Sequence, residues 1–68
     1  MRREIAAELV AQYLAFREIF NRITELSLQI DDATEAKAVR HLNANAFDSF
    51  DEIVRIVGRK FPDLVPED

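Results

Sequence analysis

The sequence lacks cysteine, and its 68 residues include only one glycine and two prolines. Without cysteine the chain forms no disulfide and offers no thiolate to a structural zinc site. Both prolines, Pro62 and Pro66, lie near the C-terminus, so few residues elsewhere suit a tight turn. These absences predict an all-α chain that gains its stability from packing alone.

The chain is also short. A single core in a domain of this size rarely supplies more than about 3–5 kcal/mol, and small domains without disulfides or metals depend on ideal packing or on oligomerisation. Hydrophobic residues make up 49% and charged residues 32%, which is typical of a globular chain and not of a disordered one. The net charge of −4 disfavours a general nucleic-acid binder, which is usually basic.

No apolar run approaches the roughly 18–20 residues that a membrane-spanning helix needs. Arg2 and Arg3 follow Met1, but Glu4 and Glu8 interrupt the apolar stretch that a secretion signal requires. We therefore expect a cytoplasmic protein with no membrane partner.

Apolar residues recur at alternating steps of four and three, the a/d repeat of packed helices, and predict a first helix over about residues 3–30. Its expected seam consists of Ile5, Leu9, Phe16, Ile19, Ile23, Leu26 and Ile30. Gln12 is the one polar residue at a seam position, and Tyr13 and Phe20 widen the apolar stripe to an arc of roughly 140°.

Asp31 and Asp32 interrupt this pattern. Asp32 is a predicted N-cap, because Glu35 follows three residues later, where a capping box places its acid. A second helix is expected over about residues 33–60, with a seam of Ala36, Val39, Leu42, Ala46, Phe50, Ile53, Val57 and Phe61. Pro62 ends this helix, and residues 62–68 are expected to form an extended tail.

The stretch from Asn43 to Asn45 leaves an alternative open. Asparagine is a poor helix former, and a break here would give a three-helix bundle. The apolar phase continues through the stretch without a slip, which favours one continuous helix. We also interpret Gln12 and Asn43 as buried amides that fix the pairing of the helices.

A turn confined to residues 31–32 makes the helices antiparallel, so residues 1–61 are predicted to form a two-helix hairpin. A hairpin has no interior, and such wide apolar arcs need a second neighbour. We therefore expect a homodimer, a four-helix bundle; the alternative is a hairpin that docks on a different protein. The predicted dimer or partner interface comprises Val10, Tyr13, Leu14, Phe16, Phe20, Leu42, Ala46, Phe47, Phe50 and Val54.

The length, the Asp31-Asp32 turn, the run Leu42-Asn43-Ala44-Asn45-Ala46 and the terminal Phe61 resemble the Rop-type family. Members of that family are small dimeric helical hairpins that regulate plasmid copy number by binding paired RNA loops. The resemblance implies a dimer that holds RNA along its first helices, where this sequence carries Arg3, Arg17 and Asn21.

Charged residues offer few candidate sites. The hairpin should bring together a cluster that could hold a phosphate or an acidic partner, here called the basic cluster: Arg2, Arg3, Arg55, Arg59 and Lys60. Basic residues at a helix C-terminus also simply complement its dipole. His41, Asp48 and Glu52 are interpreted as solvated surface groups, and Asp51 and Arg55 as an i,i+4 ion pair.

We predict no catalytic or metal-binding residue and no cofactor, because no Ser or Cys nucleophile lies one helical turn from His41. The leading hypothesis is a small non-enzymatic protein-interaction module, a homodimeric helical bundle that acts as an adaptor or regulator. The alternative is a Rop-like RNA-binding regulator; nucleic acid is the less favoured partner.

Overall fold

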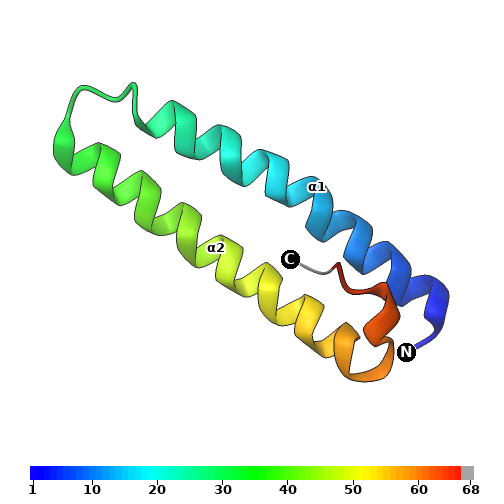
Figure 1. Ribbon diagram of the computed structural model, residues 1–68. Coiled ribbons are helices and arrows are strands. Elements are labelled where there is room, and N and C mark those ends of the chain that lie inside the picture. Colours follow the sequence, from blue (N-terminus) through cyan, green and yellow to red (C-terminus); the bar gives the residue numbers. More distant parts are fainter. Residues whose placement is uncertain (67–68) are drawn as a thin grey trace.

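The computed structural model describes residues 1–66 and consists of two long antiparallel helices (Figure 1). Helix α1 spans Arg3–Ser27, helix α2 spans Ala33–Lys60, and a short 3-10 helix, η1, spans Pro62–Leu64. The predicted all-α hairpin is therefore confirmed. The three-helix alternative is wrong, because α2 continues without a break through Asn43 and Asn45.

The connection between the helices is longer than predicted. Helix α1 ends at Ser27, three residues before Ile30, and residues 28–32 lead into α2. The amides of Leu28, Gln29 and Ile30 each donate to the carbonyl three residues back, which tightens the end of the helix into a turn. Asp32 is the N-cap of α2, as predicted: its Oδ1 accepts from the amides of Thr34 at 2.8 Å and Glu35 at 3.0 Å.

The helices meet along an inner seam that differs from the prediction. In α1 it is shifted by one residue, and its buried members in the two helices are Ala6, Val10, Tyr13, Ser27, Ala36, Asn43, Val54 and Val57. The predicted seam residues Ile5, Ile19 and Leu26 keep 42%, 54% and 43% of their surface exposed. In α2, Leu42, Ala46 and Ile53 of the predicted seam are exposed as well, and Asn43 and Val54 are buried instead. The predicted orientation of α1, and the predicted seam of α2 at these three positions, were therefore wrong.

Small and polar residues account for this orientation. Ala6, Ser27 and Ala36 let the helix backbones approach closely, which bulky residues at the same positions would prevent. Asn43 donates through Nδ2 to the carbonyl of Phe20 at 3.1 Å and to Oγ1 of Thr24 at 3.2 Å. A buried amide with a partner across the seam fixes the register, as was expected of Asn43 from its place in the sequence. The same expectation is wrong for Gln12, which is exposed.

Aromatic side chains fill the middle of the hairpin. The rings of Tyr13 and Phe20 in α1 lie 5.9 and 4.7 Å from that of Phe47 in α2. Phe16 stacks on Phe50 with 4.2 Å between the ring centroids. Of these five residues only Tyr13 is buried, so the cluster remains open on one side.

The C-terminal segment, residues 61–66, folds back onto the open end of the hairpin, where the N-terminus also lies (Figure 1). Leu64 and Phe61 pack against a core of Ala6, Val10 and Val57, and Asp63 pairs with Arg3. The prediction of an extended tail is wrong for Pro62–Leu64, because Phe61 accepts a turn hydrogen bond from the amide of Leu64 at 3.0 Å. The predicted tail also includes residues 67–68, which lie outside the described residues.

Candidate functional site

One side of the hairpin carries a second set of apolar residues, most of them one position before a residue of the inner seam. Both helices are right-handed and they run in opposite directions, so these positions lie on the same side of the hairpin. We call this surface the apolar face; its members are Ile5, Leu9, Phe16, Ile19, Ile23 and Leu26 of α1 and Val39, Leu42, Ala46, Ile53 and Ile56 of α2.

The apolar face is largely open to solvent. Leu42 exposes 66% of its surface, Ile19 54% and Ile56 51%. The intervening Leu9, Phe16, Ile23 and Val39 are half-buried, so they connect the exposed residues into one continuous surface. A contiguous apolar surface along both helices, unlike scattered single residues, is typical of an interaction site.

The total surface supports this conclusion. The chain exposes 5308 Å², whereas a globular monomer of 7.8 kDa exposes about 4,400 Å². The excess of about 900 Å² arises because the hairpin is a rod, 45 × 19 × 15 Å, with little interior. Its largest fully buried side chains are those of Val57 and Ser27. The inner seam alone thus leaves the bulkiest aliphatic residues uncovered.

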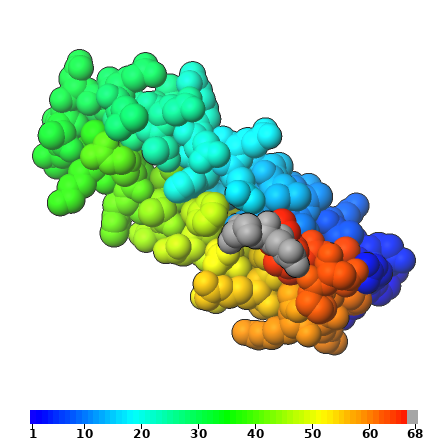
Figure 2. All heavy atoms as spheres, viewed as in Figure 1, coloured from blue at the N-terminus to red at the C-terminus, as the bar shows by residue number. Residues whose placement is uncertain are grey.

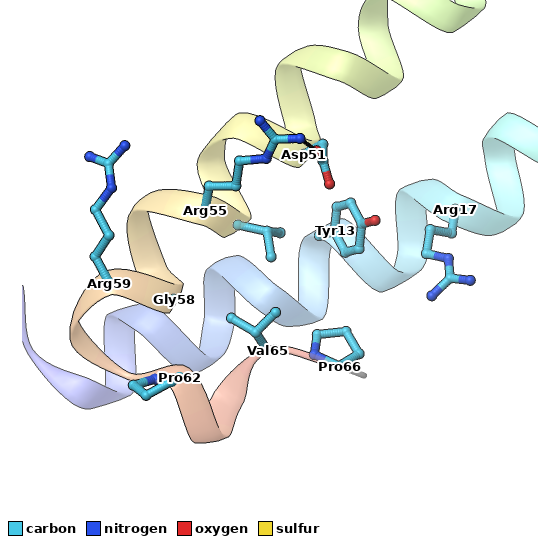
Figure 3. A pocket seen from close by; sticks show the side chains of 10 residues that line it. Tyr13, Arg17, Asp51, Arg55, Gly58, Arg59, Pro62, Val65 and Pro66 are labelled. Atoms are coloured by element: carbon cyan, nitrogen blue, oxygen red, sulfur yellow. Dashed lines mark ion pairs between the residues drawn. The ribbon is translucent and has the colours of Figure 1, made fainter. Parts of the chain in front are cut away.

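The opposite side of the hairpin carries the C-terminal segment, which lies over the junction of the two helices (Figure 2). A groove of about 600 Å³ runs beside it and is lined by the buried side chains of Tyr13 and Val54. Val65 and Pro66 lie along one wall of the groove (Figure 3). A Cβ atom added at Gly58 would lie 3.1 Å from Cγ2 of Val65. The only glycine of the chain therefore stands where the C-terminal segment crosses α2.

Arginines border this groove. Arg17 and Arg59 extend away from it on opposite sides, while Arg55 turns back to Asp51, with 2.9 Å between Arg55 Nη2 and Asp51 Oδ2 (Figure 3). The predicted i,i+4 pair is thus confirmed. The groove has basic edges and an apolar base.

The basic cluster is partly neutralised. Arg3 pairs with Asp63, and its guanidinium lies 5.7 Å from the centre of the Phe61 ring. The hydrogen bond from Arg3 lowers the pKa of Asp63 below its ordinary value. Arg55 is likewise paired, with Asp51. Among residues 1–66, the members of the basic cluster that form no ion pair are therefore the exposed Arg2, Arg59 and Lys60.

The residues of the predicted interface fall into three environments. Val10, Tyr13 and Val54 are buried between the two helices of the same chain. The four phenylalanines, Phe16, Phe20, Phe47 and Phe50, are half-buried in the aromatic cluster. Leu42 and Ala46 are exposed on the apolar face, whereas Leu14 is 43% exposed on the opposite side.

Five exposed residues of the apolar face were not predicted to belong to that interface. Ile5, Ile19, Leu26 and Ile53 were placed in the inner seam, because a wide apolar arc does not show which part faces the neighbouring helix. Ile56, 51% exposed, was assigned to neither surface. Its spacing from Ile53 and Val39 puts Ile56 on the same side of the helix as these residues, and this is the signal that could have assigned it to the apolar face.

The remaining candidate groups form no site within residues 1–66. His41, Asp48 and Glu52 are exposed, and the described part of the chain contains no group of three His, Asp or Glu side chains arranged to hold a metal ion. Over the same residues, neither long helix is apolar enough to cross a bilayer.

The comparisons with known proteins add no family. No protein-family model matches the sequence, and no curated protein or solved structure shows a significant match to the chain. The function of the chain is therefore inferred from its fold, its apolar face and its groove.

Proposed function

We propose that this protein is a non-enzymatic protein-interaction module that works as a homodimer, in which a second copy covers the apolar face to form a four-helix bundle. Such a bundle would act as an adaptor or regulator. We place it in the cytoplasm, because a chain without cysteine does not depend on an oxidising compartment for disulfide formation. The observation that carries the proposal is the continuous apolar surface from Ile5 to Ile56, exposed across both helices.

The exposed area matches what a dimer requires. Stable protein interfaces bury about 800 Å² on each partner, and the chain exposes about 900 Å² more than a globular monomer of its mass. A second copy is the simplest occupant, because a two-fold axis presents the same surface to itself. One face-to-face contact would remove the excess from both chains at once.

The internal packing points the same way. The aromatic cluster is open on the side of the apolar face, since Phe16 stacks on Phe50 and both are half-buried. In a four-helix bundle each helix has two neighbours, and these rings become part of a central layer. Dimerisation would thus complete a core that the single hairpin leaves half-covered.

RNA binding, the alternative that the resemblance implied, has less support. It would use Arg3 and Arg17, but Arg3 is paired with Asp63 and lies against Phe61. The net charge of −4 opposes the approach of a phosphate backbone. We therefore propose a protein partner rather than a nucleic acid.

A matched pair of substitutions tests the proposal. Ile19 lies on the apolar face and Leu14 on the opposite side of the same helix, with 54% and 43% of their surfaces exposed. We expect Ile19→Glu to shift the protein to monomer in sedimentation velocity, because it buries two charges at a two-fold interface. Leu14→Glu should leave the dimer intact. A dimer that tolerates both substitutions equally would contradict the proposal.

A further inference from the structure

We propose that the two copies pair head to tail, with the connection of one hairpin beside the open end of the other, so that α1 packs on α1 and α2 on α2 of the partner subunit. This inference rests on the proposed dimer and specifies its topology. It follows from the order of residues along the apolar face and from the charges at its two ends.

The stripe of α2 on this face is a palindrome in residue type. When two copies of α2 lie antiparallel, aliphatic residues of one copy face aliphatic residues of the other, and small residues face small residues. An acidic residue also faces a basic one. With one residue from each copy, the matched positions are Glu35 with Lys60, Val39 with Ile56, Leu42 with Ile53, and Ala46 with Ser49. The four pairs share one centre, between Phe47 and Asp48, which fixes a single register.

The stripe of α1 has its centre at the same height. Leu9 and Ile23 are related by reversal about Phe16, and Ile5 and Leu26 by reversal about a point half a residue earlier, so the Phe16 rings of the two copies come together near the centre. Within one hairpin Asn43 bonds to Phe20 and Phe50 stacks on Phe16, so Phe16 is level with the centre of the α2 stripe. One two-fold axis, perpendicular to the helices, therefore passes close to the centre of both stripes, with Ile19 opposite Gln12 of the partner subunit.

The alternative dimer places both connections at the same end, so that α1 faces α2 of the partner subunit. That arrangement brings Arg2 beside Lys60 of the partner subunit, and it places Glu35 against the aliphatic Leu26 of the partner subunit. The head-to-tail arrangement instead pairs Glu35 with Lys60 of the partner subunit, twice in each dimer. The charges at the ends of the apolar face thus favour head-to-tail pairing.

Distance measurement between spin labels tests this topology. The chain has no cysteine, so Asp31→Cys introduces a single labelling site, exposed in the connection and away from the apolar face. Head-to-tail pairing predicts about 40 Å between the two labels, since about 28 residues at a rise of about 1.5 Å separate the ends. Connections at the same end would bring the labels within about 20 Å and overturn the inference alone.

Sedimentation of the same labelled protein separates the two ways of failing. A monomer at all concentrations would overturn the proposed dimer and this inference together. A dimer with the short distance would overturn only the topology.

A charge exchange supplies an independent test. Glu35→Lys should raise the dimer dissociation constant roughly tenfold, because two exposed ion pairs become two repulsive contacts. The double variant Glu35→Lys/Lys60→Glu should restore it. If the two residues act only through the dipole of their own helix, the double variant should be worse than the single one, because both charges then oppose that dipole. Failure to restore the dimer would contradict the pairing.

Discussion

Replacing Asn43 should show how much its hydrogen bonds and how much its buried volume contribute to the stability of the hairpin. Its side chain is 6% exposed and donates to the carbonyl of Phe20 and to Oγ1 of Thr24 across the inner seam. Thr24 Oγ1 itself donates to the Phe20 carbonyl at 3.0 Å. Neither acceptor is stranded when Asn43 is removed, which limits the cost of the change.

Asn43→Ala should lower the free energy of unfolding by about 2 kcal/mol, since it loses two hydrogen bonds of about 0.5–1.5 kcal/mol each and some packing. In a domain of this length that is a fall in Tm of about 8–16 °C. Asn43→Leu should cost less than about 1 kcal/mol, because an apolar side chain of similar volume replaces a buried amide without leaving a partner unpaired.

Thermal unfolding followed by circular dichroism, at one fixed protein concentration, checks these values. Asn45→Ala is the matched control: Asn45 is exposed on the same helix, and Ala is the better helix former, so its Tm should not fall. The proposed role of Asn43 is refuted if Asn43→Ala unfolds within about 2 °C of the parent protein, or if Asn43→Leu is as destabilising as Asn43→Ala.

Two further predictions concern the C-terminal segment. Gly58→Ala should raise the stability of the protein by less than about 1 kcal/mol, because α2 gains a better helix former while Val65 moves by a few tenths of an ångström; a lower Tm would show that the segment cannot yield. Because Arg3 lowers the pKa of Asp63, the contact between them is fully formed above the ordinary Asp value of 3.8 and is lost as pH falls through the lower folded value. An NMR titration of the Asp63 carboxyl should give a midpoint below 3.8, and Arg3→Ala should return it to the ordinary value.

The ends of the elements follow from local chemistry, and sequence reasoning found most of them. Asp32 predicts the start of α2, because the first amides of a helix lack backbone partners and need a side-chain acceptor. Pro62 predicts its end. The short turn η1 was not predicted, because two turn hydrogen bonds and the packing of Leu64 on the core stabilise it. Contacts of that kind depend on the folded hairpin.

Which of two neighbouring seams each helix turns toward the other could not be predicted from hydrophobicity. An apolar arc of roughly 140° accommodates two seams one residue apart, and the more apolar one was predicted to face α2. The hairpin instead uses the seam that includes Ser27, Thr24 and Asn43, where small size and hydrogen bonding outweigh apolar area. The more apolar seam became the exposed face, which is the candidate site.

Sedimentation equilibrium of the unmodified chain tests the central claim most directly. Over a range of concentrations, we expect the molar mass to approach twice the chain mass of 7.8 kDa, because the apolar face is covered by a second copy. A mass that stays at 7.8 kDa at every concentration would show that the exposed face does not mediate self-association, and would contradict the account.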